Sequence, residues 1–473
     1  MVDGRALTAQ FEDAADFETR KVLCGGQLLT VLFLDGLTSG GDIAEQVVRP
    51  LAQMTDEARE EVLYTRALQG GVWCASVKEP ESTQQAAELL VNGFCVILFP
   101  KSGKALGCEV KTGEKRSPSP PETENTVKGA KDAFTETLRT NTSLVRRHLR
   151  TPGLRLTETV IGKRTLTKVT VCWIDRLTDP ELPRRMQERL SSIDIDGALS
   201  PAAIEEYVTG SRRTAFPLLE YTERTDHVCQ GLLDGQVGLL VDGLPLGYLA
   251  PVGLGRLMRS PEDRATDFFS ASMLRLLRYA ALGVSLLLPA LYAAMAMFHQ
   301  QMLPTKLLLS IIESKQNVPF STLLEVLGLL CAFELLQQAG LHLPQAVGTA
   351  VSIIGGLVVG TAAVDAKLVS PAALIVTASS GICGFTLPNR ELSDAVRLWR
   401  FVLTVLAGLW GLFGVTVGLL LLLTELAGLE SLGRSYLSPF GRAEVKGALV
   451  RPRLVRQKWR DGALKPMDDQ NQR

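Results

Sequence analysis

The sequence has little that nucleic-acid binding requires. Aromatic residues make up only 6% of its 473 residues, and 50 basic residues balance 50 acidic ones, so the formal net charge is zero. Proteins that bind nucleic acid usually gather basic side chains on one surface, often with aromatic residues that stack on bases. We therefore expect no nucleic-acid partner.

Motifs for catalysis and metal binding are also missing. The chain contains no P-loop, GxGxxG, GxSxG or HExxH motif, its four histidines are scattered, and its eight cysteines form no CxxC pair. Such motifs hold phosphates, nucleophiles or metals at fixed spacings. We therefore expect no enzymatic activity, no cofactor and no metal site, and interpret the cysteines as buried thiols in a reducing compartment.

The N-terminus lacks the features of a signal peptide. Its opening sequence, "MVDGRALTAQFEDAADFETRK", is polar and acidic, with neither a basic start nor an apolar run behind it. A secretory signal needs both. We therefore expect the first 260 residues to stay in the cytosol.

Long apolar runs begin after about residue 275. Residues 279–298, 346–364 and 401–424 are each long enough to cross a hydrocarbon core of about 30 Å. Arginines precede the first run and a basic tail follows the last, which favours cytosolic ends and an even number of crossings. Two further segments, 318–340 and 370–388, compete to supply the fourth crossing. Either choice places Arg390, Arg397 and Arg400 outside, against the usual charge rule.

Small residues recur every fourth position in the second run, at Gly348, Ser352, Gly356 and Gly360. Such a stripe lets helix backbones approach closely in lipid. The stripe predicts a packing face, either inside the chain or between copies. The short segment 370–388 contains two glycines and ends in proline, so it is either a short span or a broken element lining a cavity.

The apolar segment 318–340 carries two acids, Glu325 and Glu334. Their positions are nine apart, which places them on opposite sides of a helix. A charge in hydrocarbon costs at least about 2.5–3.5 kcal/mol. The helix must therefore lie at the interface, be wrapped by protein or border water. Two interpretations remain: glutamates solvated at the interface, or an acid beside a water-filled path that selects cations.

The N-terminal half contains a weak internal repeat. Short apolar runs alternate with amphipathic stretches, which predicts an α/β or α+β fold. "LFLDGLT" at 32–38 matches "CWIDRLT" at 172–178, and "AAELLVNGFCVILF" at 86–99 matches "VCQGLLDGQVGLLV" at 228–241. Two matches at nearly the same offset predict two related modules.

The chain is accordingly divided into four parts. The first, 1–127, is a cytosolic module that ends in a Pro- and Ser-rich linker at 111–127. The second, 128–265, is a linking helix at about 130–150 and the second module. The third, 266–440, is a transmembrane bundle of about four to five helices, and the fourth, 441–473, is a basic cytosolic tail.

A dense polar stretch lies in the second module. Within "LLEYTERTDHV", residues 218–228, we expect Glu223, Arg224 and Asp226 to form an interdomain salt-bridge network. Asp226 is also a candidate N-cap for the helix that precedes Asp234.

Several stretches together carry a family resemblance. They include "TNTSLVRRHLRTPGL", "FPLLEYTERTDHV", "RSPEDR", "PFSTLLEVLGLLCAFELLQQAGLHLP", "LPNRELSDAVRLWRF" and "LGRSYLSPF". In the sequences of these motifs and in their order, the chain resembles the GerA-type spore germination proteins, the A subunits of bacterial spore germinant receptors. The first hundred residues fit more loosely, through "VLFLDGL" and "GFCVILF".

The resemblance implies a multi-pass protein of the spore inner membrane. It further implies that copies assemble into a ring, a nutrient-gated cation channel that works with a transporter-like B subunit and a lipoprotein C subunit. A paralogue associated with the dipicolinate channel fits the same motifs. The alternative is a non-conducting scaffold whose cytosolic modules assemble the germination complex.

In a ring, one acid per copy becomes a circle of acids that concentrates cations. Glu325 and Glu334 are the candidate pathway residues, and Asp365 is a candidate mouth residue. Because Lys367 follows closely, a local ion pair is the other interpretation of Asp365.

Overall fold

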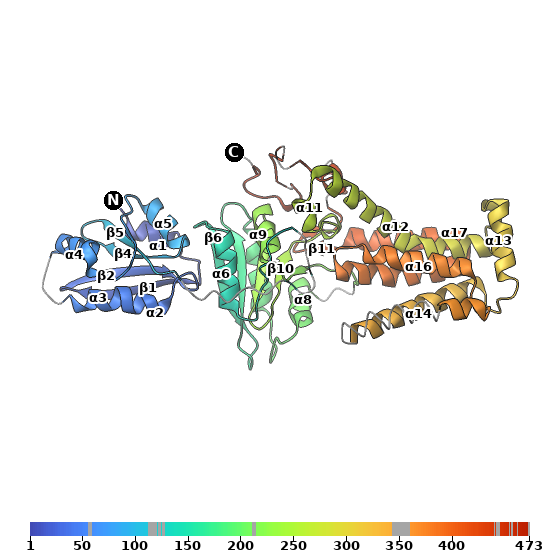
Figure 1. The fold of residues 1–473 in the computed structure, drawn as a ribbon, viewed down its shortest axis with the longest axis horizontal. Helices are drawn as coiled ribbons and strands as arrows, with labels where there is room; N and C mark the ends of the chain where they lie inside the picture. The colour runs from blue at the N-terminus through green and yellow to red at the C-terminus, as the bar shows by residue number, and fades with distance from the viewer. Residues whose placement is uncertain are drawn as a thin grey trace.

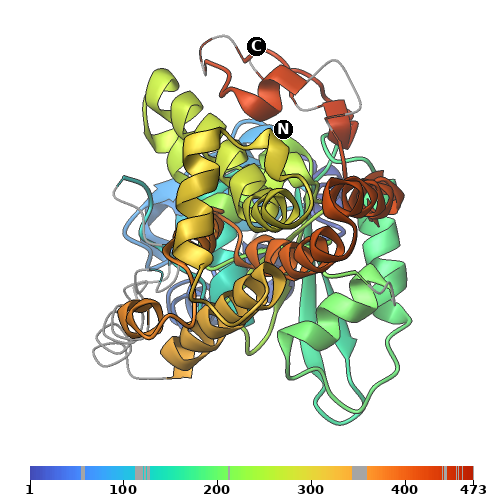
Figure 2. The same cartoon turned by 90° about the vertical axis from the view of Figure 1, so that its right-hand side faces the viewer.

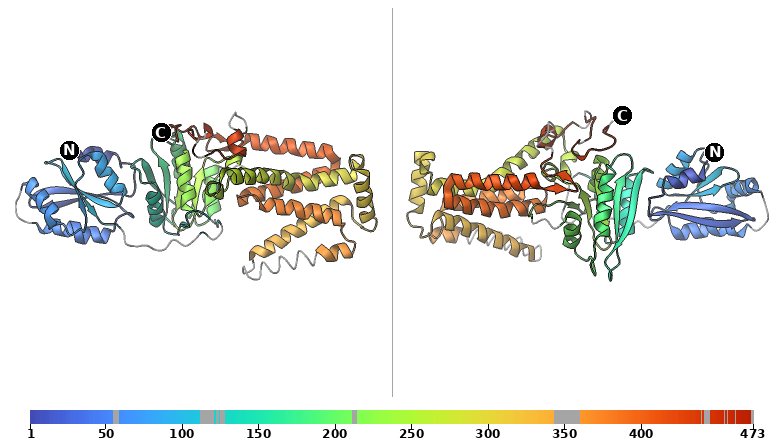
Figure 3. Two further views of the ribbon diagram at one scale, coloured as in Figure 1. Left: turned by 45° about the horizontal axis from the view of Figure 1, so that its top comes forward. Right: turned by 180° about the vertical axis from the view of Figure 1, so that it is seen from behind.

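The chain folds into two sheet modules and a helical bundle that lie in a row (Figures 1 and 3). The computed structural model describes residues 1–471 except 55–58, 112–120, 122–123, 125–127, 211–213, 343–359, 439, 441–444, 454, 456 and 461. Strands occupy the N-terminal half and long apolar helices the C-terminal half. The predicted fold class is therefore confirmed. The predicted linker, 111–127, lies almost entirely outside the described residues.

The first module is a five-stranded antiparallel sheet in the order β1-β2-β4-β5-β3. Its strands are β1 (Phe17–Cys24), β2 (Gln27–Leu34), β3 (Val77–Lys78), β4 (Phe94–Phe99) and β5 (Lys104–Glu109). Its helices are α1 (Gly4–Ala9), α2 (Gly40–Asp42), α3 (Arg49–Gln53), α4 (Glu60–Arg66) and α5 (Thr83–Val91).

The second module repeats this topology in the order β6-β7-β9-β10-β8. Its strands are β6 (Leu154–Ile161), β7 (Thr167–Ile174), β8 (Glu220–Thr222), β9 (Val237–Val241) and β10 (Gly247–Ala250). Its helices are α6 (Leu138–His148), α7 (Glu181–Ser191), α8 (Pro201–Thr209) and α9 (Thr225–Asp234). Both sequence matches fall on equivalent elements, the end of β2 or β7 and the pairs α5–β4 or α9–β9. The expected duplication is thus present in the fold.

Each sheet is covered by helices on both faces. In the first module, Val31 and Ile97 enter the core beneath α3 and α4, whereas Leu32 and Val96 enter the core beneath α1 and α5. Successive strand residues point to opposite faces, so these buried central strands are apolar throughout. This explains why β4 is buried at all six positions.

A buried ion pair joins the two modules. The guanidinium of Arg146, on α6, donates two hydrogen bonds to the carboxylate of Asp16, and both side chains are almost completely buried. Helix α6 begins at Leu138, later than the predicted start near residue 130. The reason is local, because the Asn141 side chain accepts the Thr135 N–H and donates to the Thr135 carbonyl. These bonds hold the preceding segment in a turn.

Among its described residues, the helical bundle contains three helices long and apolar enough to cross a membrane. These are α12 (Phe268–Met297), α14 (Thr322–His342, of which Thr322–Ala339 is the matching stretch) and α17 (Arg390–Gly428). The shorter apolar helix is α16 (Pro371–Phe385), and α13 (Thr305–Lys315) lies across the end remote from the modules (Figure 1). Figure 2 views this bundle end-on.

Helix α17 reverses direction at Gly411, which has φ +62° and ψ −141°. A straight 39-residue helix would extend about 58 Å, nearly twice the hydrocarbon core. A Cβ on Gly414 would overlap the Leu406 carbonyl, and one on Gly418 would lie 2.5 Å from Leu403 Cδ2. In a straight helix such pairs would be about 12 and 22 Å apart. The structure therefore divides the span predicted at 401–424 into two antiparallel arms.

This reversal resolves the conflict over the arginines. Gly411 lies against Phe298 and His299, at the end of α12 remote from the modules. The start of α17 lies at the modules, because Asn389 and Leu257 line one small pocket. Segments 318–340 and 370–388 both contain helices, so neither has to be chosen over the other. Arg390 consequently lies on the side of the modules, as the charge rule favours.

Hydrogen bonds and ion pairs join the second module to the bundle. Two short helices, α10 (Leu254–Leu257) and α11 (Glu262–Ala265), connect it to α12. Asp263, in α11, accepts hydrogen bonds from Arg275 and Arg278 in α12. A short hairpin, β11 (Glu430–Ser431) and β12 (Arg434–Ser435), returns from α17 to the module. Its Ser431 hydroxyl donates to the Leu218 carbonyl and accepts the Val252 N–H.

The polar stretch of the second module makes contacts both within and beyond the module, since Arg224 Nη1 also donates to the Glu124 carbonyl at 3.5 Å. Arg224 donates two hydrogen bonds to Asp226, at 3.0 and 2.6 Å, within the module. The prediction that Asp226 caps α9 is wrong. Arg224 occupies the cap position, and the Asp226 carboxylate is already engaged by its guanidinium.

Candidate functional site: charged groups in the bundle and a pocket at its base

Glu325 lies inside the bundle, with 2% of its surface exposed. One carboxylate oxygen accepts the backbone N–H of Ser370, and the other lies 3.4 Å from Lys315 Nζ. Ser370 is the N-cap of α16, and its hydroxyl accepts the Ala373 N–H. Glu325 is itself in the first turn of α14. A carboxylate here therefore stabilises two helix N-termini and a lysine at once.

Glu334 lies two and a half turns further along α14 and contacts α17. Its Oε1 accepts a hydrogen bond from Arg397 Nη1 at 2.7 Å, and Arg397 Nη2 pairs with Asp394 on the same helix. The second oxygen of Glu334 is buried and has no hydrogen-bond partner among the described residues. Arg397 therefore pairs with two acids, whereas only one of the two carboxylate oxygens of Glu334 has a hydrogen-bond partner among the described residues.

Arg400 lies one turn deeper in α17 and is 1% exposed. Its Nη1 donates to the Ser380 hydroxyl at 3.2 Å, and that hydroxyl donates to the Ser285 carbonyl at 2.7 Å. Its Nε and Nη2 are buried and lack a hydrogen-bond partner in the part of the chain that the structure describes. The bundle thus contains a guanidinium without an acid in contact.

The remaining predicted residues lie elsewhere. Asp365 is exposed at the end of a helix at 360–365, and no ion pair joins it to another described residue. A Cβ on Gly360 would lie 3.7 Å from Leu374, so this glycine faces α16 within the same chain. The other three members of the stripe, Gly348, Ser352 and Gly356, lie outside the described residues.

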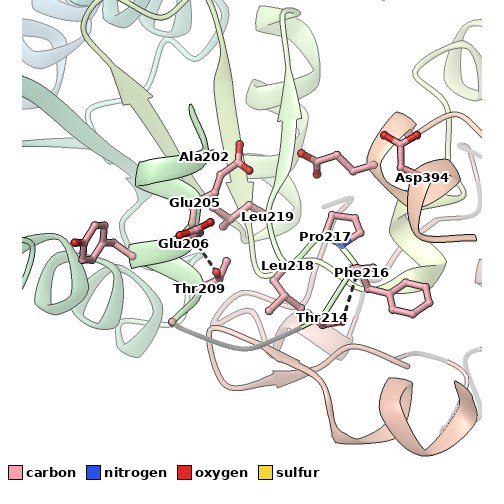
Figure 4. Close-up of a pocket in the computed structure, with 14 residues that line it drawn as sticks. Ala202, Glu205, Glu206, Thr209, Thr214, Phe216, Pro217, Leu218, Leu219 and Asp394 are labelled. Atoms are coloured by element: carbon pink, nitrogen blue, oxygen red, sulfur yellow. Dashed lines mark hydrogen bonds between the residues drawn. The ribbon is translucent and has the colours of Figure 1, made fainter. Parts of the chain in front are cut away.

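An acidic pocket of about 790 Å³ lies where the second module meets α17. Glu205 and Glu206 approach it from α8, and Asp394 approaches from the opposite wall (Figure 4). Burial raises the pKa of the Glu205 carboxyl above its ordinary value. Asp394 also forms an ion pair with Arg397, which in turn pairs with Glu334. A residue that lines the pocket is therefore linked to Glu334 through Arg397.

An apolar core connects the same junction. It combines Phe216, Leu218 and Val252 of the second module with Leu392, Val396 and Leu426 of α17. The Thr214 hydroxyl, in the segment between α8 and β8 that also carries Phe216, donates to Glu425 Oε1 at 2.7 Å. Because this core is continuous, a shift of α17 has to move the module or break the packing.

A second polar cluster fixes the joint between module and bundle. Asp234 accepts hydrogen bonds from Arg256 at 3.2 Å and Arg264 at 3.0 Å. Burial alone raises the pKa of Asp234, but the charges of Arg256, Arg264 and Arg259, with a hydrogen bond from Gln230, outweigh it and hold that pKa below the usual value. The carboxylate is therefore ionised at neutral pH and retains both arginines.

Sequence reasoning identified Glu325 and Glu334 but not their partners. Lys315 and Arg397 come from other segments, and Arg400 was considered only as a marker of topology. A signal was present, because Arg397 and Arg400 are spaced three apart on a helix that leads into an apolar run. Across the described ranges, no group of three or more His, Cys, Asp or Glu residues is arranged to hold a metal ion.

Comparison with known proteins places the chain in a family. Residues 5–466 match the family "Bacillus/Clostridium GerA spore germination protein". The chain is 34% identical to spore germination protein KA of Bacillus subtilis, over 93% of this chain and 81% of that protein. It is 36% identical to the uncharacterized membrane protein YfkQ of the same organism, over 94% and 87%.

A solved structure is also similar. It is the N-terminal domain of the A subunit of the Bacillus megaterium spore germinant receptor GerK3, with a TM-score of 0.41 and 24% identity. The match covers 52% of this chain and 92% of that one. Given the family match over nearly the whole sequence, the chain belongs to the GerA family of spore germination proteins.

Proposed function

We propose that the chain is the A subunit of a spore germinant receptor, and that copies of it form a cation channel that opens when a nutrient is sensed. Its partners are a transporter-like B subunit, a lipoprotein C subunit and membrane lipids. It resides in the spore inner membrane, with both termini in the cytosol. The names of its relatives and three helices of membrane-crossing length support this assignment.

Glu334 is the acid best placed to act on passing cations. It lies on α14, whose apolar window is only 22% buried, against 44% for α12 and 39% for α17. One of its oxygens is already bonded to Arg397 and the other is uncommitted. Glu325, by contrast, has a contact on each oxygen: Oε1 accepts the Ser370 N–H, and Oε2 makes no hydrogen bond among the described residues but lies 3.4 Å from Lys315 Nζ. We assign Glu325 to anchoring and Asp365 to the mouth remote from the modules.

The four parts of the chain have distinct roles in this proposal. Residues 1–127 and 128–265 are the cytosolic modules that contact partners. Residues 266–440 are the membrane domain, and 441–473 form a tail on the cytosolic side. Consistent with this, the Met467 N–H donates to the Leu177 carbonyl of the second module.

Glu334→Gln tests the channel function. Spores that carry this variant are expected to release potassium at least about tenfold more slowly after nutrient addition, since the amide cannot attract cations. Potassium in the medium is measured by a selective electrode. Glu313→Gln, at an exposed site on α13, is the matched control and should release at the normal rate. Normal release from the Glu334 variant would contradict the proposal.

A scaffold without conduction is the second candidate. The continuous apolar core between the second module and α17 favours it, because it couples movements of the module, where partners bind, to movements of the membrane helices. The two candidates differ in assembly and flux. A scaffold predicts a monomer in mild detergent and no cation flux in vesicles, whereas a channel predicts an oligomer and flux.

A further inference from the structure

The bundle contains an unbalanced distribution of four charges. Two acids, Asp394 and Glu334, face two arginines, Arg397 and Arg400, so the group is neutral as a whole. Yet both acids pair with Arg397, at 2.7 Å in the case of Glu334. Arg400 has the Ser380 hydroxyl as its hydrogen-bond acceptor among the described side chains. Among the described residues, Arg397 therefore has two acids in contact and Arg400 has none.

This arrangement is unfavourable for Arg400. An uncompensated guanidinium within a membrane helix is unfavourable, because hydrocarbon cannot solvate its charge. Two of its three nitrogens are buried without a hydrogen-bond partner in the described structure. Glu334 is the acid that acts on it electrostatically, and one oxygen of Glu334 is equally unused.

We propose that Glu334 is a mobile carboxylate that transfers from Arg397 to Arg400, and that this transfer is a switch between two positions of the Glu334 side chain. After transfer, Asp394 retains Arg397 and Glu334 pairs with Arg400. Each arginine then has one acid. Two complete pairs replace one crowded pair and one isolated charge.

The geometry permits the transfer. Arg397 and Arg400 are three residues apart, on one face of α17 and about 4.5 Å apart along its axis. Helix α14 rests on small residues: a Cβ on Gly381 would lie 2.6 Å from the Phe333 ring, and one on Gly408 2.4–2.8 Å from Leu323. These side chains fill the hollows above the two glycines and hold α14 in register, as does the bond from Glu325 to the Ser370 N–H. The movement that carries the carboxylate across is therefore a rotation of the Glu334, Arg397 and Arg400 side chains.

The switch deepens the proposed channel function and rests on it for its consequence. In the present pairing, the free charge of Arg400 lies inside the bundle and repels cations. Transfer neutralises that charge. Asp394 also lines the acidic pocket. A change in the position or charge of Asp394 in the pocket would therefore change which acid pairs with Arg397. Arg397 and Arg400 are positioning residues in this scheme.

Arg400→Met tests the switch through two opposed effects. The variant removes an isolated buried charge, so the unfolding temperature of the full chain in detergent should rise by about 2–4 °C. It also removes the acceptor of Glu334, so nutrient-triggered potassium release should fall at least about tenfold. Arg390→Met, at an exposed site, is the matched control and should change neither. A lower unfolding temperature for Arg400→Met would overturn the proposal.

Double-mutant cycles test the transfer without measuring flux. With Arg397 present, the effects of Glu334→Gln and Arg400→Met on unfolding temperature should deviate only slightly from additivity, because Glu334 acts on Arg400 without contacting it. In an Arg397→Met background the deviation should grow by at least about 3 °C, because Glu334 then pairs with Arg400. An equal deviation in both backgrounds would refute the transfer. A larger deviation in the Arg397→Met background together with normal potassium release from Arg400→Met would leave the transfer standing and refute its link to the channel.

Discussion

Gly411→Ala is expected to disrupt the bundle and abolish nutrient-triggered germination. The φ of +62° and ψ of −141° lie where side chains other than glycine are strained by about 1–3 kcal/mol. A Cβ there would also lie 2.7 Å from His299 Cε1 and 3.0 Å from Phe298 Cβ. Strain and overlap together should cost at least about 3 kcal/mol of unfolding free energy. Without the reversal, the returning arm of α17 cannot reach the second module.

The matched control is Gly283→Ala. Gly283 lies inside α12, and a Cβ there would meet no atom within 4 Å. Alanine is the better helix former, so this variant should be neutral or up to about 1 kcal/mol more stable. Thermal unfolding of the full chain in detergent measures both. Equal stability of the two variants would show that Gly411 does not need its special conformation.

Glu325→Ala is expected to lower stability by about 3–5 kcal/mol, since it leaves a partly buried lysine without its acid. Lys315 loses a carboxylate at 3.4 Å, and the Ser370 N–H at the start of α16 loses its acceptor. Glu325→Gln retains an acceptor for that N–H and should cost about 1–3 kcal/mol. Thermal unfolding of the three proteins should therefore rank them wild type, glutamine, alanine.

The exposed Glu313→Gln is again the control and should change stability by less than about 0.5 kcal/mol. Combining Glu325→Ala with Lys315→Ala should recover part of the loss, because the unpaired lysine is removed as well. If Glu325→Ala is as stable as Glu313→Gln, the carboxylate does not anchor α14 to α16.

The duplicated modules were predictable from the sequence because their signals are local. Asp35 and Asp175 each follow a buried strand, and a helix ended by Gly93 or Gly235 precedes another. Such signals need only neighbouring residues. The covering of both sheet faces also explains why β4 and β9 lack the alternation of a half-exposed strand.

The hairpin in α17 was not predictable from hydropathy. Residues on both sides of Gly411 are equally apolar, and glycine is common in membrane helices, so nothing in composition separates a kink from a reversal. The cause is tertiary, because Phe298 and His299 occupy the space beside Gly411.

The partners of the acids were also hidden from sequence reasoning. The cost of an acid at membrane depth predicted a polar environment or a charged partner for Glu325 and Glu334. It did not distinguish among protein side chains, water and lipid headgroups as the source of that environment. Lys315 and Arg397 supply it from segments 10 and 63 residues away, and such pairings depend on the packed bundle.

Side-specific labelling of single cysteines tests the arrangement of the bundle most directly. Asn317→Cys, Pro388→Cys and Glu430→Cys are each made in a background of Cys74→Ser, Cys331→Ser and Cys383→Ser, which removes the cysteines that are not buried. All three positions are exposed and lie outside the bundle helices. A membrane-impermeant maleimide is applied to sealed vesicles of known orientation. The structure predicts that positions 388 and 430 react from one side, which is the cytosolic side in the proposed orientation, and position 317 from the opposite side. Reaction of positions 388 and 430 from opposite sides would contradict the hairpin and, with it, the placement of the acid–arginine cluster.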